Sequence, residues 1–69
     1  MKVLVEAVWD GEAGVWVATA ADDKIGLVAE AAAIERLQLK LALMVPDLLG
    51  GDGPYEIELV ARRTQTVAA

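Results

Sequence analysis

Few side chains in this sequence can take part in covalent or acid–base chemistry. The 69 residues include no His, Cys, Ser or Asn, which removes the usual nucleophiles and the commonest general base. Carboxylates remain, with eleven acidic residues against six basic ones. The adjacent Asp22 and Asp23 offer oxygen ligands to a hard cation, but neighbouring carboxylates in a turn usually diverge. The sequence therefore favours a solvated turn over a metal site, and it predicts no catalytic residue, no metal and no cofactor.

The acidic residues also indicate how a protein partner would be recognised. Many of them lie in or near predicted turns: Asp10, Glu12, Asp22, Asp23 and Glu30. Such a rim attracts a basic protein and speeds its association, although the same residues can simply keep a small domain soluble. Trp is frequent at binding hot spots, whereas a pair such as Trp9 and Trp16 in so small a domain is more often core. The candidate partner-binding residues are Trp16, Asp22, Asp23 and Glu30.

Size and charge restrict the class of protein. A chain this short has a small core and, without Cys, no disulfide to stabilise it, so oligomerisation is the remaining means. The net charge of −5 repels nucleic acid, and the dipeptide Arg62–Arg63 is too small for a phosphate-binding patch. No apolar run spans a bilayer, and Glu6 comes too early for a signal peptide. We expect a cytoplasmic homodimer or higher homo-oligomer that binds neither nucleic acid nor membrane.

A β-hairpin is predicted at the start of the chain. Residues 2–9 and 15–20 read as strands, joined by an acidic turn that contains two glycines. Pairing Trp9 with Trp16 would place both indoles on one face, where they could stack. Neither face of residues 15–20 is strongly polar, so we expect this strand to be covered on both sides. A short third strand is predicted over residues 26–29.

Helical spacing replaces the strand pattern at about residue 32. The apolar stripe consists of Ile34, Leu37, Leu41, Met44 or Val45, and Leu48. It predicts a helix over residues 32–45 that begins without a capping side chain, and Pro46 is expected to kink or break it near Val45, leaving a short turn to residue 49. Leu39 and Leu43 lie off the stripe. Since one small sheet has only one helix to cover, we predict that these two leucines form an oligomer contact.

Strand periodicity returns over residues 54–63, and residues 64–69 read as a loose tail. The apolar side chains of this last strand, Tyr55, Ile57, Leu59 and Ala61, face one way. The sequence thus predicts a single α+β domain over residues 1–69. In it, an antiparallel sheet has one helix packed on a face, in the order β-β-β-α-β.

With its predicted elements in this order, the sequence resembles the HicB-like antitoxin family, in particular its short stand-alone branch of unknown function. The segments that carry the resemblance are Trp9-Asp10, Gly14 through Thr19, Asp22-Asp23, Gly26-Leu27, Glu30-Ala31 and Ile34 through Leu37. The resemblance as a whole covers nearly the whole chain. The chain departs from the family pattern at Lys24-Ile25-Gly26, where the family often has a Pro-Gly turn, and at Ala33, where it usually has a capping Thr or Ser.

The resemblance implies a partial ribonuclease-H-like βββαβ domain without nuclease activity. In full-length family members this domain covers the active face of a small basic toxin that cleaves messenger RNA, and a C-terminal segment binds operator DNA. Residues 1–69 hold no such segment, so we expect no DNA binding here. The function expected from the resemblance is non-catalytic neutralisation of a small basic toxin-like protein in a bacterial cytoplasm. The alternative is an orphan homo-oligomeric scaffold or small-ligand-binding domain.

Overall fold

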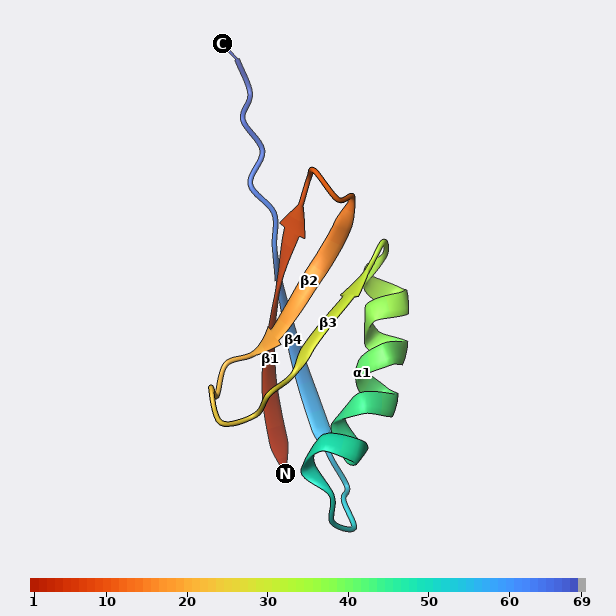
Figure 1. Cartoon of the computed structure of the whole chain (residues 1–69). Coiled ribbons are helices and arrows are strands. Elements are labelled where there is room, and N and C mark those ends of the chain that lie inside the picture. Colours follow the sequence, from red (N-terminus) through yellow and green to blue (C-terminus); the bar gives the residue numbers. More distant parts are fainter. Residues whose placement is uncertain (69) are drawn as a thin grey trace.

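One helix and a four-stranded sheet make up the fold of the computed structural model, which describes residues 1–68 (Figure 1). The elements follow the predicted order β-β-β-α-β. They are β1 (Lys2–Asp10), β2 (Val15–Ala20), β3 (Val28–Ala31), α1 (Ile34–Leu49) and β4 (Glu56–Arg62). The α+β class and the position of the helix between the third and fourth strands are therefore confirmed. Residue 69, the last of the predicted domain and tail, lies outside the described residues.

The sheet has the strand order β3-β2-β1-β4 and is mixed. The β1–β2 and β2–β3 pairs are antiparallel as predicted, but β4 pairs in parallel with β1. The prediction of an antiparallel sheet thus holds for three strands and not for the fourth. The connection explains the parallel pairing. Helix α1 carries the chain back along the sheet after β3, so β4 runs in the same direction as β3. β3 and β1 are both antiparallel to β2, so β4 is also parallel to β1.

The core lies between α1 and one face of the sheet. Alternate residues of β1 point towards the helix, and Val3, Val5 and Ala7 are buried there. The helix contributes Leu37, Leu41 and Val45, which belong to the predicted stripe and are also buried. From the same stripe, Ile34 and Met44 pack against this cluster, whereas Leu48 is exposed.

The hairpin has the predicted register, with Trp9 directly opposite Trp16. The two indole rings meet edge to face, with their centroids 5.4 Å apart and their planes at 64°. The turn between the strands is closed by a hydrogen bond from the Gly14 amide to the Asp10 carbonyl oxygen. Gly14 has a φ of 68°, a conformation that residues with a Cβ rarely adopt.

The third strand begins two residues later than predicted. The Ile25 amide donates to the Asp22 carbonyl oxygen and the Leu27 amide to that of Ile25, so the turn continues to Leu27. The strand then starts at Val28. The shift by two residues preserves the alternation of the strand, so the apolar side chains still face the helix.

The helix is continuous from Ile34 to Leu49, whereas the sequence predicts a kink or break near Val45 and a separate turn. Pro46 lies inside it on the exposed side. Because Ala42, whose carbonyl loses its partner at Pro46, is also exposed, water can solvate the freed oxygen. Ala33 occupies the N-cap without a side-chain hydrogen bond, as predicted. The helix ends where the Gly50 amide bonds to the Pro46 carbonyl oxygen.

Candidate functional site

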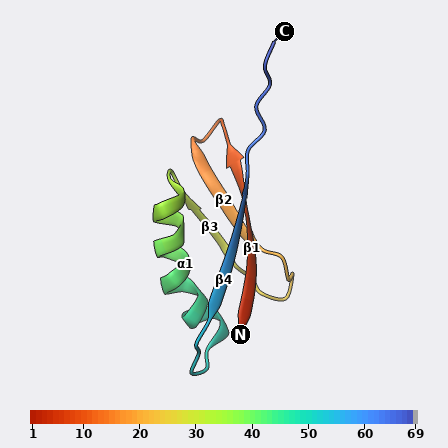
Figure 2. The ribbon, with the colours of Figure 1, turned by 180° about the vertical axis from the view of Figure 1, so that it is seen from behind.

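The face of the sheet that points away from α1 is an unpartnered surface within residues 1–68. Figures 1 and 2 show the helix on one side of the strands only. We call the opposite side the open face, and its apolar side chains are Leu4, Val8, Val15, Val17, Val28 and Val60. The expectation that β2 is covered on both sides is therefore wrong for this chain alone. Val17 and Thr19 point to the open side, while Trp16 and Ala18 face the helix.

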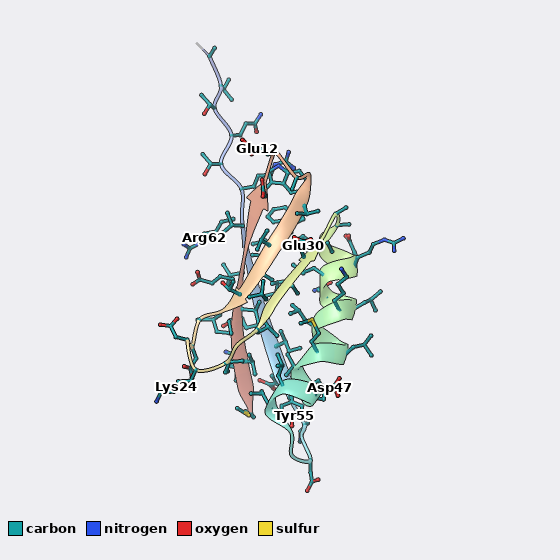
Figure 3. The ribbon with its side chains drawn as sticks, viewed as in Figure 1. Glu12, Lys24, Glu30, Asp47, Tyr55 and Arg62 are labelled. Carbon is teal, nitrogen blue, oxygen red and sulfur yellow. The ribbon has the colours of Figure 1, made fainter. Side chains whose placement is uncertain are left out.

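The strand registers place the open-face residues side by side. Val8 lies between Val17 on β2 and Arg62 on β4, and Val17 lies in turn beside Glu30 on β3. Figure 3 shows Glu30 and Arg62 on the two edge strands of the sheet. The next row carries Val28, Thr19, Glu6 and Val60 in that order. Each row therefore combines apolar centres with charged groups.

Exposure of the apolar side chains on this face is high. The exposed fraction is 55% for Val8 and 65% for Val28, and both Leu4 and Val60 are 38% exposed. Acidic side chains predominate around them: Glu6, Glu30, Glu56 and Glu58. Of the two basic residues on this face, Lys2 forms an ion pair with Glu58 at 3.6 Å. The open face thus combines exposed apolar side chains with a negative surround.

Of the four predicted partner-binding residues, Glu30 alone lies on the open face. Trp16 points to the opposite side, where it packs half-buried against the core and against Trp9. Asp22 and Asp23 lie in the loop between β2 and β3, and the Asp22 carboxylate accepts a 3.0 Å hydrogen bond from the Lys24 amide. The structure therefore does not bring these four residues together on one surface.

Asp10, at the start of the hairpin turn, is engaged in a similar way. The Asp10 carboxylate accepts hydrogen bonds from the backbone amides of Glu12 and Ala13, at 3.1 and 3.3 Å. These local bonds are typical of an Asx turn. The Asp10 side chain thus has a structural role in shaping the turn.

The sequence analysis did not name Val8, Val28 or Val60 as contact residues, although Val60 falls on the polar face predicted for the last strand. A signal was present in β1 and β4, where β-branched residues occupy both alternating sets of positions. Periodicity alone does not reveal which of two apolar faces the helix covers. That choice is set by the single crossover helix, which can cover one side only.

A second apolar surface lies beside α1, next to the edge strand β3. We call it the helix flank; it is a shallow depression lined by Ala31, Ala32, Arg36, Leu39, Lys40 and Leu43. Leu39 is 68% exposed and Leu43 75%, in keeping with the prediction that they lie off the core. The Lys40 ammonium donates a hydrogen bond to the carbonyl oxygen of Glu30 on the free edge of β3.

Another hollow lies where the C-terminal tail passes the hairpin. It is lined by Trp9, Gly11, Arg63, Thr64 and Gln65, and the Arg63 guanidinium lies 4.5 Å from the centre of the Trp9 ring. This cation–π contact fixes the start of the tail against the sheet. The tail then leaves the body of the molecule, as Figure 2 shows.

Within residues 1–68, no three acidic side chains come close enough to form a metal-binding group. In the same part of the chain, α1 is too short and too polar to cross a bilayer. Neither observation assigns a function. The candidate functional surfaces are therefore the open face and the helix flank.

Comparisons with known proteins bear on the fold and the family of this chain. No protein of curated function is similar enough to count as a relative. The fold resembles the crystal structure of the hypothetical protein TTHA1013 from the extremely thermophilic bacterium Thermus thermophilus. The TM-score is 0.76 and the sequences are 44% identical, over 97% of this chain and 100% of that one. Residues 2–67 match the model of a domain of unknown function, DUF1902, and the chain therefore belongs to the DUF1902 family.

Proposed function

We propose that this chain is a non-catalytic protein-binding domain whose open face captures a small basic protein. The observation that carries the proposal is the combination of exposed valines and surrounding carboxylates on one side of the sheet. An apolar centre supplies binding energy when it is covered, and the charged surround selects the sign of the partner. The net charge of −5 adds a long-range attraction for a positively charged protein.

The finer form of the proposal is antitoxin-like neutralisation in the bacterial cytoplasm. It is supported by the resemblance to HicB-like antitoxins over most of the chain, and by the absence of His, Cys, Ser and Asn from the sequence. In this mechanism the open face covers the active face of a small basic toxin. Neutralisation is then steric and electrostatic, and it requires no chemistry from this chain.

Trp16 has a supporting role in this proposal. It lies on the helix side of β2 and holds the hairpin against the core, while Val17 beside it reaches the open face. Of the predicted partner-binding residues, Glu30 is the one whose position suits direct contact. Asp22 and Asp23, at the end of the sheet, contribute to the negative field around it.

The proposal predicts that a neighbouring short reading frame encodes a basic protein, and the test is a growth assay with that protein. We expect this protein to arrest growth when it is expressed alone, and co-expression of the wild-type chain to restore growth. Val8→Lys should abolish the rescue, because it places a positive charge at the centre of the open face. Val67→Lys is the matched control, since Val67 is 77% exposed in the tail and the change in net charge is the same.

A purified pair would give a second measurement by isothermal titration. We expect a dissociation constant raised at least about tenfold by Val8→Lys, equivalent to about 1.4 kcal/mol, and little changed by Val67→Lys. A neighbouring product that is neither toxic nor bound would reject the antitoxin role. Binding that survives Val8→Lys would reject the open face as the contact.

A further inference from the structure

The helix flank is the second surface that the fold leaves uncovered, and its leucines are more exposed than any apolar side chain of the open face. Leu39 and Leu43 lie one helical turn apart, beside the methyl groups of Ala31 and Ala32. Exposed large side chains arranged contiguously in this way indicate a contact surface. The nature of the occupant follows from the groups around them.

An added β-strand is disfavoured as the occupant. The free edge of β3 is only four residues long, and Lys40 already donates to the Glu30 carbonyl oxygen on that edge. A short edge protected by lysine is a common way to prevent strand addition. The partner of the flank must therefore contact the helix itself.

The charges along the flank indicate what kind of helix fits. Arg36, Leu43 and Asp47 are separated by seven and four residues, so they lie on nearly the same side of α1. Arg36 stands before the leucines and Asp47 after them, and both are exposed. Figure 3 labels Asp47 near the end of α1. A complementary surface has the same apolar centre with its charges in the opposite order. An antiparallel copy of α1 has this pattern.

We propose that the helix flank binds a second copy of this chain through an antiparallel α1–α1 contact around a two-fold axis. One register places Leu39 beside Leu43 of the second copy. In that register Arg36 lies within one residue of the position directly opposite Asp47 of the second copy. The two-fold symmetry repeats both contacts, so each copy supplies and receives the same pair.

Electrostatics favours this surface over others for self-association. Each copy carries a net charge of −5, and most surfaces of two copies therefore repel each other. The flank is an exception because its cations, Arg36 and Lys40, are followed along α1 by the acidic Asp47, so an antiparallel copy brings unlike charges together. The same two cations make it a poor site for a basic protein, so the dimer contact and the proposed open-face partner use different surfaces. The open face lies across the sheet from α1, which leaves it free in the dimer.

The experiment is sedimentation velocity of the full chain over a range of concentrations. A contact between two 16-residue helices is at the small end of protein interfaces, so we expect dissociation in the micromolar range. The monomer should predominate near about 1 µM and the dimer near about 1 mM. Leu43→Asp should abolish dimerisation. Val28→Asp, on the open face and similarly exposed, is the matched control and should leave it unchanged.

A charge-reversal cycle tests the register. Arg36→Asp and Asp47→Arg should each weaken the dimer about tenfold, because each creates two like-charged contacts. The double variant Arg36→Asp/Asp47→Arg should restore the dimer to within about threefold of wild type. Within one helix these residues are about 16 Å apart, so they cannot pair with each other in a single copy.

Three outcomes would overturn the proposal. They are a monomer at every concentration, a dimer that tolerates Leu43→Asp, and a double variant no stronger than either single one. Partner capture through the open face is measured separately, with Val8→Lys. Failure of one proposal therefore leaves the other untouched.

Discussion

Asp10 and Asp22, one at each of the two turns, have carboxylates that accept local hydrogen bonds, while Glu30 on β3 faces outward. Asp10 and Asp22 accept hydrogen bonds from backbone amides within three residues, and these bonds define the shapes of their turns. Glu30 stands on the open face of an edge strand. A carboxylate used in an Asx turn is oriented by its own backbone, so it is a weaker candidate for partner contact than one on a flat sheet. This distinction cannot be made from residue type, because both kinds are simply Asp or Glu in the sequence.

Gly14 gives a prediction at the same scale. Its φ of 68° is required by the hairpin turn, and an L-residue in that conformation costs about 1–2 kcal/mol. We expect Gly14→Ala to lower the free energy of unfolding by about that amount, as measured by urea denaturation followed by tryptophan fluorescence. Gly26→Ala is the control, since Gly26 has open space around it and no positive φ. Equal effects of the two substitutions would contradict this account of the turn.

Helix α1 has two kinds of leucine, and the sequence pattern separated Leu37 and Leu41 from Leu39 and Leu43, although it also assigned the exposed Leu48 to the buried stripe. Leu41 is fully buried, while Leu43 is 75% exposed. We expect Leu41→Ala to destabilise the chain by about 2–5 kcal/mol, because it leaves a cavity in a small core. Leu43→Ala should change stability by less than about 0.5 kcal/mol when it is measured well below the dimerisation range. Thermal unfolding by circular dichroism distinguishes the two, and a large loss for Leu43→Ala in the monomer would place that side chain in the core.

The elements also differ in how much of their structure the sequence predicts. The hairpin register and the buried stripe of α1 followed from local spacing, which fixes faces and neighbours within a few residues. The parallel pairing of β1 with β4 did not, because a period of two shows which side chains share a face and not which strand lies alongside. For the same reason, Leu39 and Leu43 were identified as an exposed surface while the open face was not. The faces of the helix follow from the spacing within its own sequence, whereas the open face is formed by residues of four separate strands.

For the whole molecule, the central position of β1 makes β4 indispensable. β1 pairs on one side with β2 and on the other with β4, and α1 packs against a surface that includes both Ile57 and Leu59. We expect a chain truncated after Gly53 to show no cooperative unfolding transition by circular dichroism. A chain truncated after Arg63 keeps all strands and the contact with Trp9, so its unfolding midpoint should match that of the full chain. A cooperative transition in the shorter chain would show that the first three strands and the helix suffice.

The parallel pairing of β1 with β4 also affects how the chain folds during its synthesis. Lys2 pairs with Glu56 and Val8 with Arg62, so β1 stays unpaired on one side until β4 has been synthesised. Until then the nascent hairpin exposes an unpaired β1 edge, which is the condition under which growing chains are most open to association with one another or to capture by chaperones. Translation that pauses between α1 and β4 would prolong this exposure, so codon usage in that short interval is expected to influence the yield of native protein.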